Sequence, residues 1–400
     1  MQIWVHWWNV VRELRPACSR NRTFLWLVIS LAGICIRSDL AGVSSIMRAL
    51  GLREECYDRL LDFFHSHAID VDGLARLWTQ LVFRLFSAAA RVNGRVVLLC
   101  DGIKIPKAGK KMPGVKLIRQ ESDSNTKPEY IMGHSVQVVS VVVNAGISAF
   151  AVPLAARIHE GLIFSNRCKQ KLTDKMVSLV QMTGITLPYY LVGDAYYACQ
   201  AVALTLIALG NHLVTRVRNN AVAYCAVNSV GKKKPGRPRF YGRKIKLKSL
   251  FKDTTSMIEI PSPVYGETNV VIRYLQIDLI WKPLKRLVRF VAVAHPVRGK
   301  CLLMCTDLTL GAADIITLYG IRFKIEVSFK SALRTLGVYT YHFWMMSMKR
   351  IKRNSLGQYM HHETEKYRQD VRRKFAAYHR HIQKRLSNRN KNIRCSNENS

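Results

Sequence analysis

Two short apolar runs that each stop at an aspartate constrain the fold of this 400-residue chain most strongly. Residues 96–100 are all apolar and precede Asp101, and residues 189–193 do the same before Asp194. Continuous apolar runs of this length are typical of strands buried on both faces of a sheet. In an open α/β sheet, functional groups collect at the carboxyl ends of neighbouring strands. We therefore expect Asp101 and Asp194 to meet at one edge of a sheet.

The order of the predicted elements supports an α/β fold with a mixed sheet. Strand patterns come first in hairpin order, and from residue 169 helix and strand patterns alternate. Before them, residues 24–90 have a helical apolar pattern in which Ser38 or Asp39 could cap a helix that ends at Leu50. The longest apolar stretch, residues 24–36, has 13 residues and is too short for the ~20 of a membrane-spanning helix, so it predicts a buried helix.

Changes in composition divide the chain into five predicted parts. Residues 1–92 form a helical N-terminal domain, which either reads DNA or only packs. Residues 93–218 and 307–348 are the two parts of a catalytic domain that carry Asp101, Asp194 and Glu326. Between them, residues 219–306 form a β-rich basic insertion, and residues 349–400 form a basic C-terminal helix and tail.

The charge of the chain predicts its partner. Lys and Arg number 62 against 26 Asp and Glu, a formal net charge of +36, which draws polyanions such as DNA. The ten cysteines include no Cys-x-x-Cys pair, which indicates reduced thiols in a cytosol, and we find no secretory signal pattern at the N-terminus.

A predicted helix over residues 311–334 supplies a third carboxylate. Tyr319, Arg322, Glu326 and Lys330 are spaced by three, four and four positions and so share one face. A separate apolar stripe would hold this helix against the sheet; it consists of Leu318, Ile321, Ile325, Ala332 and Leu336. Without the two aspartates, an ordinary charge ladder on a solvated face would be the better explanation of Glu326.

Three convergent carboxylates suit a specific chemistry. Hard oxygen ligands bind Mg²⁺ or Mn²⁺, and two such ions about 4 Å apart can activate a water or a 3′-hydroxyl and stabilise the leaving oxygen of a phosphodiester. We therefore expect Asp101, Asp194 and Glu326 to be catalytic metal ligands, with Arg322 and Lys330 holding phosphate beside them.

At these residues the chain resembles the DDE transposases of bacterial insertion sequences, which are related to retroviral integrases. The similar segments are residues 98–102, residues 191–197, and residues 319–326, which match a Tyr-x2-Arg-x3-Glu signature. The signature continues with a lysine where this chain has Leu333, and Lys330 is the candidate replacement.

The resemblance implies an RNase H-like catalytic domain with a β-rich insertion between the second Asp and the Glu. It further implies cleavage of transposon ends and joining of the 3′-hydroxyl to target DNA, with double-stranded DNA as partner and no membrane. A dimer on DNA, in the cytoplasm and at the bacterial nucleoid, is expected by analogy.

Further candidate DNA contacts lie outside the three carboxylates. Lys104, Lys107, Lys110, Lys111 and Lys116 follow Asp101 in a loop that would reach the DNA backbone. Arg237 and Arg239 lie in a basic Gly-Arg-Pro segment that resembles a minor-groove hook, although a solvated basic loop fits the pattern better. Trp281 could stack on a displaced base, with core packing the more ordinary role. His134 could face the metals, but a buried, hydrogen-bonded histidine fits its position better.

Three other functions are compatible with these residues. A nonenzymatic nucleic-acid-binding protein would use the charge alone and need no metal. A metal-dependent nuclease on the same fold would cut without joining. A decayed transposase would fold without activity, an alternative kept open by Leu333.

Overall fold

The computed structural model describes residues 2–37, 42–106, 116–119, 130–146, 148–159, 171–227, 239–264 and 266–337. One sheet dominates them, with the strand order β3-β4-β2-β6-β7-β13-β12-β11-β8-β9; β1, β5 and β10 pair with β2, β4 and β11. The predicted mixed α/β fold is confirmed, since β2, β6 and β7 are parallel and their neighbours are antiparallel.

The first half of the sheet contains the strands expected from the apolar runs and two further short strands, over residues 91–92 and 116–119, that were not predicted. They are β1 (Arg91–Val92), β2 (Arg95–Pro106), β3 (Lys116–Arg119), β4 (Tyr130–Ala145), β5 (Ser148–His159), β6 (Tyr189–Gly193) and β7 (His212–Arg216). β2 is longer than predicted. It continues past Asp101 because β4 pairs with it as far as Pro106, whereas its pairing with β6 ends at Leu99.

The predicted insertion is rich in strands, and these strands extend the same sheet. They are β8 (Val222–Tyr224), β9 (Lys244–Lys246), β10 (Ile258–Pro261), β11 (Val271–Trp281), β12 (Arg286–His295) and β13 (Gly299–Cys305). β13 pairs antiparallel with β7, so main-chain hydrogen bonds join this region directly to the strands of the first half. A short 3-10 segment, η3 (Leu247–Lys252), packs against β12 and β13.

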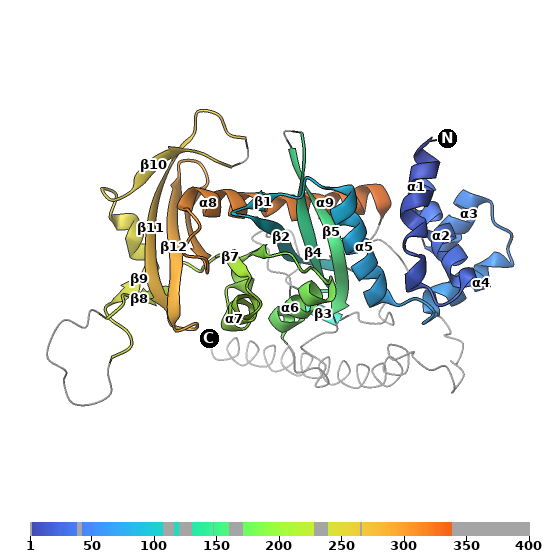
Figure 1. Ribbon diagram of the computed structural model, residues 1–400, viewed down its shortest axis with the longest axis horizontal. Coiled ribbons are helices and arrows are strands. Elements are labelled where there is room, and N and C mark those ends of the chain that lie inside the picture. Colours follow the sequence, from blue (N-terminus) through green and yellow to red (C-terminus); the bar gives the residue numbers. More distant parts are fainter. Residues whose placement is uncertain are drawn as a thin grey trace, which may run out of the picture.

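Helices cover both faces of the sheet (Figure 1). On one face α6 (Leu172–Met182) and α7 (Gln200–Ala208) bury Met176 and Leu206 against the strands. On the opposite face α8 (Ala312–Ile321) and α9 (Phe323–Ser331) bury Leu318 and Ile325. This three-layer arrangement leaves each side of the central strands in contact with apolar side chains, as their sequence requires.

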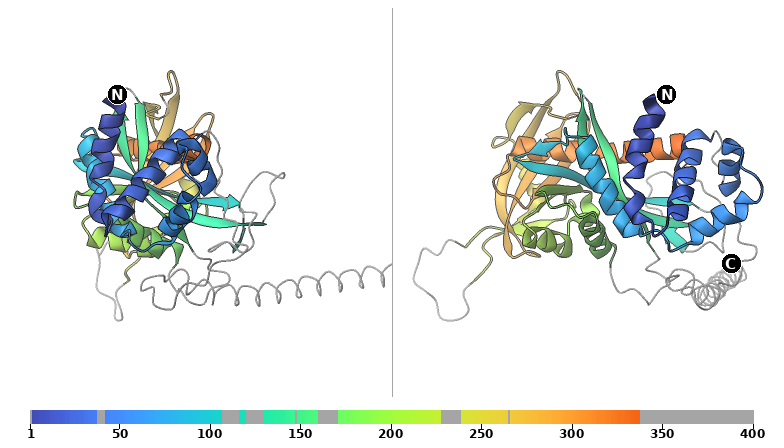
Figure 2. Two further views of the ribbon diagram at one scale, coloured as in Figure 1. Left: turned by 90° about the vertical axis from the view of Figure 1, so that its right-hand side faces the viewer. Right: turned by 45° about the vertical axis from the view of Figure 1, so that its right-hand side comes forward.

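The N-terminal part is helical, as predicted, and forms a bundle beside the sheet (Figure 2). It consists of α1 (Gln2–Arg12), η1 (Arg15–Ala17), α2 (Asn21–Ile36), α3 (Val43–Leu50), α4 (Cys56–His65) and α5 (Val71–Leu85). Its own core includes Leu27, Ile46 and Leu60. α5 connects the bundle to the sheet, because Trp78 Nε1 donates a 2.8 Å hydrogen bond to the carbonyl of Pro153 on β5.

Two details of the helical prediction change. α3 begins at Val43 after Gly42 and has no side-chain cap; the proposed caps Ser38 and Asp39 lie outside the described residues. The apolar stretch 24–36 is helical but only one of its faces is buried, and Leu25 is 55% exposed. In the described ranges, no helix is both long and apolar enough to span a membrane.

Candidate active site

The strand register places Asp101 and Asp194 at one level of the sheet. β2 and β6 pair in parallel with a constant offset, from Val96 opposite Tyr189 to Leu99 opposite Val192, which is 93 positions (192 − 99). Asp101 and Asp194 have the same offset (194 − 101 = 93). They therefore lie two residues beyond the last position at which β2 and β6 pair, Asp101 within the longer β2 and Asp194 just after the carboxyl end of β6.

The same register determines the face to which both side chains point. Side chains alternate along a strand, so Asp101 shares a face with Leu99, and Asp194 shares one with Val192. Leu99 and Val192 belong to the apolar cluster that also contains Leu318 and Ile325 of the covering helices. Both aspartates thus belong to the side of the sheet that carries α8 and α9.

Local backbone contacts fix each aspartate. Asp101 Oδ1 accepts a 2.8 Å hydrogen bond from the amide of Gly102. Asp194 precedes the short turn η2 (Ala195–Tyr197), and its Oδ1 accepts a 3.0 Å hydrogen bond from the amide of Tyr196. The hydroxyl of Thr215 on β7 donates to the carbonyl of Asp194 at 2.6 Å. These bonds hold both carboxylates at the strand ends.

Glu326 reaches this site through Arg322. The predicted helix over residues 311–334 is divided at Arg322 into α8 and α9, and ends in a π-helical turn, η4 (Ala332–Leu336). Arg322 Nη1 donates to Asp101 Oδ2 at 2.8 Å, and Nη2 donates to Glu326 Oε1 at 2.6 Å. Glu326 therefore points toward the strand ends from α9, which packs against β2 and β5.

The carboxylates influence one another electrostatically. Burial raises the pKa of Asp101 to about 6; Arg322 and the Gly102 amide oppose this rise, and the charges of Asp194 and Glu326 add to it. Burial alone would lower the pKa of Arg322, but Asp101, Tyr319 and Glu326 raise it above its ordinary value. The site is a partly buried cluster of three carboxylates that already contains one cation, the guanidinium of Arg322.

The residues of the site can hold a divalent ion by their chemistry, because all three candidates offer hard carboxylate oxygens. Within the described ranges, however, no three His, Cys, Asp or Glu side chains lie close enough together to hold a metal in their present conformation. Arg322 occupies the space between two of them. A shared ion therefore requires side-chain movement at Arg322 and Glu326.

The other predicted DNA-contacting residues that the structure describes differ in their exposure. Tyr319 is half-buried beside the site, and Arg322 lies over its ring at 5.9 Å from the centroid. Lys104 and Arg239 are exposed, as is Lys330 one turn after Glu326. Leu333 packs against the apolar cluster beneath α8 and α9, so the side chain at the position of the signature lysine serves the core.

Other predicted site residues are buried or lie outside the described residues. Trp281 is only 7% exposed and packs in the core, so core packing, its alternative interpretation, describes it better than base stacking. His134 is likewise buried. Lys107, Lys110, Lys111, Arg237 and the tail over residues 349–400 lie outside the described residues, and the side chain of Lys116 does also.

Arg216 is a candidate that the sequence interpretation missed. β6 and β7 pair in parallel with an offset of 22 positions, as for Gly193 opposite Thr215 (215 − 193), which places Arg216 at the level of Asp194 (216 − 194 = 22). Its side chain is exposed, and its charge acts on Tyr319. Only the pairing register reveals this, because nothing in the sequence near Arg216 resembles the catalytic signature.

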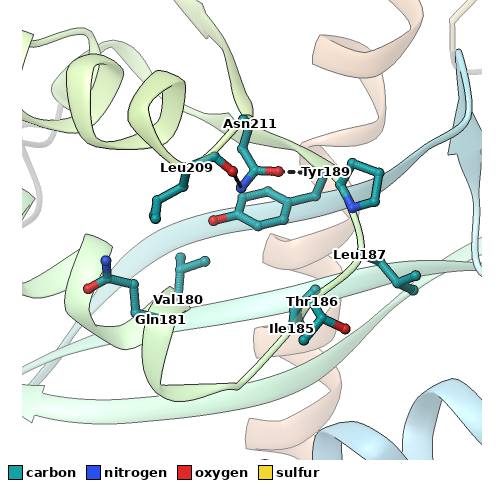
Figure 3. Close-up of a pocket in the computed structure, with 10 residues that line it drawn as sticks. Val180, Gln181, Ile185, Thr186, Leu187, Tyr189, Leu209 and Asn211 are labelled. Carbon is teal, nitrogen blue, oxygen red and sulfur yellow. Dashed lines mark hydrogen bonds between the residues drawn. The ribbon is translucent and has the colours of Figure 1, made fainter.

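A pocket of about 310 Å³ lies elsewhere (Figure 3). It is lined by residues between the end of α6 and the start of β6, and by Leu209 and Asn211 after α7. Asn211 already accepts from the amide of Tyr189 and donates to the carbonyl of Leu209. The pocket begins where β6 begins, whereas Asp194 follows the other end of that strand.

Comparison with family models shows the family of the chain. A family model described as DDE superfamily endonuclease matches residues 13–262, which is more than half of the chain. The chain belongs to the DDE superfamily endonucleases. The match covers Asp101 and Asp194 and ends before Glu326, so Glu326 is assigned from geometry and signature alone. Endonucleases of this superfamily generally use divalent metal ions.

Among solved structures, the chain is similar to a piggyBac transposase in a cryo-EM synaptic complex with hairpin DNA. The two share 11% identity with a TM-score of 0.36, over 81% of this chain and 65% of that chain. The alignment therefore spans less than two thirds of the neighbour's length. No curated protein matches the sequence.

Proposed function

We propose that this DDE superfamily endonuclease is a cut-and-paste transposase that cleaves transposon ends and joins the freed 3′-hydroxyl to target DNA. The observation that carries the proposal is the shared level and face of Asp101 and Asp194, with Glu326 held toward them by Arg322. Under this proposal the three carboxylates are the catalytic residues. The three carboxylates come from elements far apart in the sequence. A charge ladder on the surface of one helix would not need the two aspartates to lie near it.

Asp101, Asp194 and Glu326 would hold Mg²⁺ or Mn²⁺, and two ions fit the chemistry best. When bound, such ions activate the attacking oxygen and stabilise the leaving oxygen of the phosphodiester. The donor set fits this role, because Asp101 is buried among negative charges that a cation would neutralise.

The surrounding cations would bind and orient the DNA strand. Arg322 and Arg216 lie on the same side of the sheet as the carboxylates, and a guanidinium matches the geometry of a phosphate. Lys330 is exposed one turn after Glu326. Tyr319 completes the surface beside Arg322. Together these residues would hold the backbone so that one phosphodiester faces the carboxylates.

We propose that the five predicted parts of the chain have distinct roles. The helical domain (1–92) would help to recognise the element's terminal repeats, and two chains would hold two ends as a dimer on DNA. Residues 219–306 would support the catalytic strands, because β13 continues their sheet. The bacterial cytoplasm is the compartment in which such an enzyme would meet its substrate.

Strand joining separates this proposal from its alternatives. The full chain is incubated with Mg²⁺, a duplex carrying the element's terminus and a supercoiled target plasmid. A transposase yields plasmid that is covalently linked to the 3′ end of the terminus. Cleavage without linked product indicates a nuclease, and metal-independent binding without cleavage indicates a DNA-binding protein or a decayed enzyme.

A further inference from the structure

Arg322 forms an arginine–carboxylate contact that differs from the others of the sheet region. Arg289 directs two nitrogens at Asp278, and Arg298 directs two at Glu267. Arg322 divides its nitrogens between Asp101 on β2 and Glu326 on α9. The side chains of Arg322 and Asp101 are 18% and 16% exposed, so solvent screens their pair only partly.

The position of this guanidinium matters because both of its partners are proposed metal ligands. Removing the positive charge would leave Asp101 close to Asp194 and Glu326 with no cation between them. Like charges at a partly buried site repel one another because solvent screens them only partly. The guanidinium of Arg322 therefore lies between Asp101 and Glu326 and supplies the positive charge that a shared metal ion would otherwise supply.

We propose that Arg322 acts as an exchangeable latch of the metal site, an inference that rests on the proposed function. Without metal, its guanidinium binds Asp101 and Glu326. When a divalent ion binds the carboxylates, Arg322 is released and binds a DNA phosphate, an anion of equivalent geometry. Metal and DNA each need the contact of Arg322 with Asp101 and Glu326 to break. Because either ligand breaks it, each raises the affinity of the chain for the other.

The latch predicts that the free protein binds metal weakly. Binding of a divalent ion must break two charge-assisted hydrogen bonds, because the ion and the guanidinium have charges of like sign and repel one another between the carboxylates. A duplex that engages Arg322 removes this cost before the metal binds. The expected coupling is on the order of tenfold in affinity, within the usual range for linked sites.

Mn²⁺ binding to the full chain tests the latch without any activity measurement. Free Mn²⁺ is titrated by electron paramagnetic resonance with wild type, Arg322→Ala and Arg322→Gln, each with and without a duplex carrying the element's terminus. In the absence of DNA, both variants should bind Mn²⁺ about tenfold more tightly than wild type. The duplex should tighten Mn²⁺ binding in wild type and have little effect in the variants.

Two controls make the result specific. Arg298→Ala breaks an arginine–carboxylate pair away from the site and should leave Mn²⁺ affinity unchanged. Asp101→Asn should remove the bound Mn²⁺, which locates it. Should either Arg322 variant unfold at the assay temperature, the Mn²⁺-induced rise in melting temperature, measured from a lower starting temperature, replaces the titration and should exceed that of wild type.

The outcomes distinguish the latch from the proposed function. If wild type binds Mn²⁺ at a site that Asp101→Asn abolishes, but the Arg322 variants bind it no more tightly, the latch is wrong and the metal site stands. If wild type with DNA binds no Mn²⁺ that depends on Asp101, both the latch and the proposed function are overturned.

Discussion

Asp101 and Asp194 are brought to the same level and face of the sheet by a parallel register that Gly193 makes possible. A methyl group on Gly193 would lie 2.8 Å from Cys100 Sγ and 2.9 Å from Tyr197 Cδ2, closer than such contacts allow. Cys100 and Tyr197 are both buried directly beside the two aspartates. The close approach of β2 and the turn after β6 thus depends on a residue without a side chain.

Gly193→Ala should destabilise the chain by roughly 1–3 kcal/mol, the usual cost of overpacking, and should impair DNA cleavage more than its stability loss explains. Denaturant unfolding and cleavage assays at a temperature where the variant is folded measure the two effects. Gly311→Ala is the matched control, because its added methyl would meet only an ordinary 3.5 Å contact with Asp314. The double variant Cys100→Ala/Gly193→Ala should recover part of the loss; simple additivity would contradict the steric explanation.

Arg216→Ala should weaken binding to a terminal duplex and reduce the salt dependence of binding by about one counterion, because one phosphate contact is lost. The variant should also cleave poorly at saturating DNA, since Arg216 lies at the level of Asp194. Arg218→Ala removes a nearby exposed charge beyond the strand end and should affect binding only slightly. Equal loss of cleavage in both variants would mean that Arg216 contributes only general charge.

The overall charge of the chain predicts steep salt dependence. With 62 Lys and Arg against 26 Asp and Glu, DNA binding should release several counterions, and the logarithm of the association constant should fall by about 0.9 per neutralised phosphate with the logarithm of salt concentration. Fluorescence anisotropy over a range of NaCl concentrations gives this slope. A flat dependence would show that the positive surface does not bind the DNA backbone.

Glu267 is expected to stabilise the region between β10 and β11. Hydrogen bonds from Ser262 and His295, together with Arg298, lower its pKa from 4.5 to about 2. A depressed acid pKa contributes stability that is present above the unfolded value and is lost as the pH falls through the folded value. Glu267→Gln should therefore melt below wild type near neutral pH, and the difference should shrink between about pH 4.5 and pH 2.

Thermal melts across that pH range measure the effect, with the exposed Glu54→Gln as a control that should follow wild type. The loop that Glu267 closes also carries Val264, which packs so tightly on α8 that a methyl on Gly320 would lie 2.4 Å from it. A constant melting difference at all pH values would show that Glu267 acts through packing and not through its charge.

Much of the catalytic half of the fold could be predicted from the sequence, because its central strands are buried on both faces and their apolar runs are continuous. The runs before Asp101 and Asp194 both became strands at the predicted positions. Local patterns could not show where a strand ends when its partner continues. β2 therefore extends to Pro106, paired with β4, although its apolar run stops at Cys100.

Pairing between residues far apart in the sequence explains the other features that could not be predicted. The antiparallel pairing of β13 with β7 joins residues about ninety positions apart, and no local pattern specifies it. Arg216 acquires its place from the same kind of pairing. The break between α8 and α9 falls at Arg322, whose side chain is engaged by carboxylates on two elements. Such contacts depend on the folded geometry, whereas the helical spacing of Tyr319, Arg322 and Glu326 could be read directly.

The central claim is that Glu326 is a metal-binding catalytic residue. Glu326→Gln keeps the shape of the side chain and removes one charged ligand, so the fold and DNA affinity should survive. The decisive measurement compares Mg²⁺- or Mn²⁺-dependent cleavage and 3′-end joining by wild type, Glu326→Gln and the exposed control Glu259→Gln on a duplex with the element's terminus. We expect Glu259→Gln to match wild type and Glu326→Gln to lose roughly a thousandfold or more in rate, because several kcal/mol of charge stabilisation disappear. An active wild type with comparable activity in Glu326→Gln would show that Glu326 belongs only to a surface charge ladder.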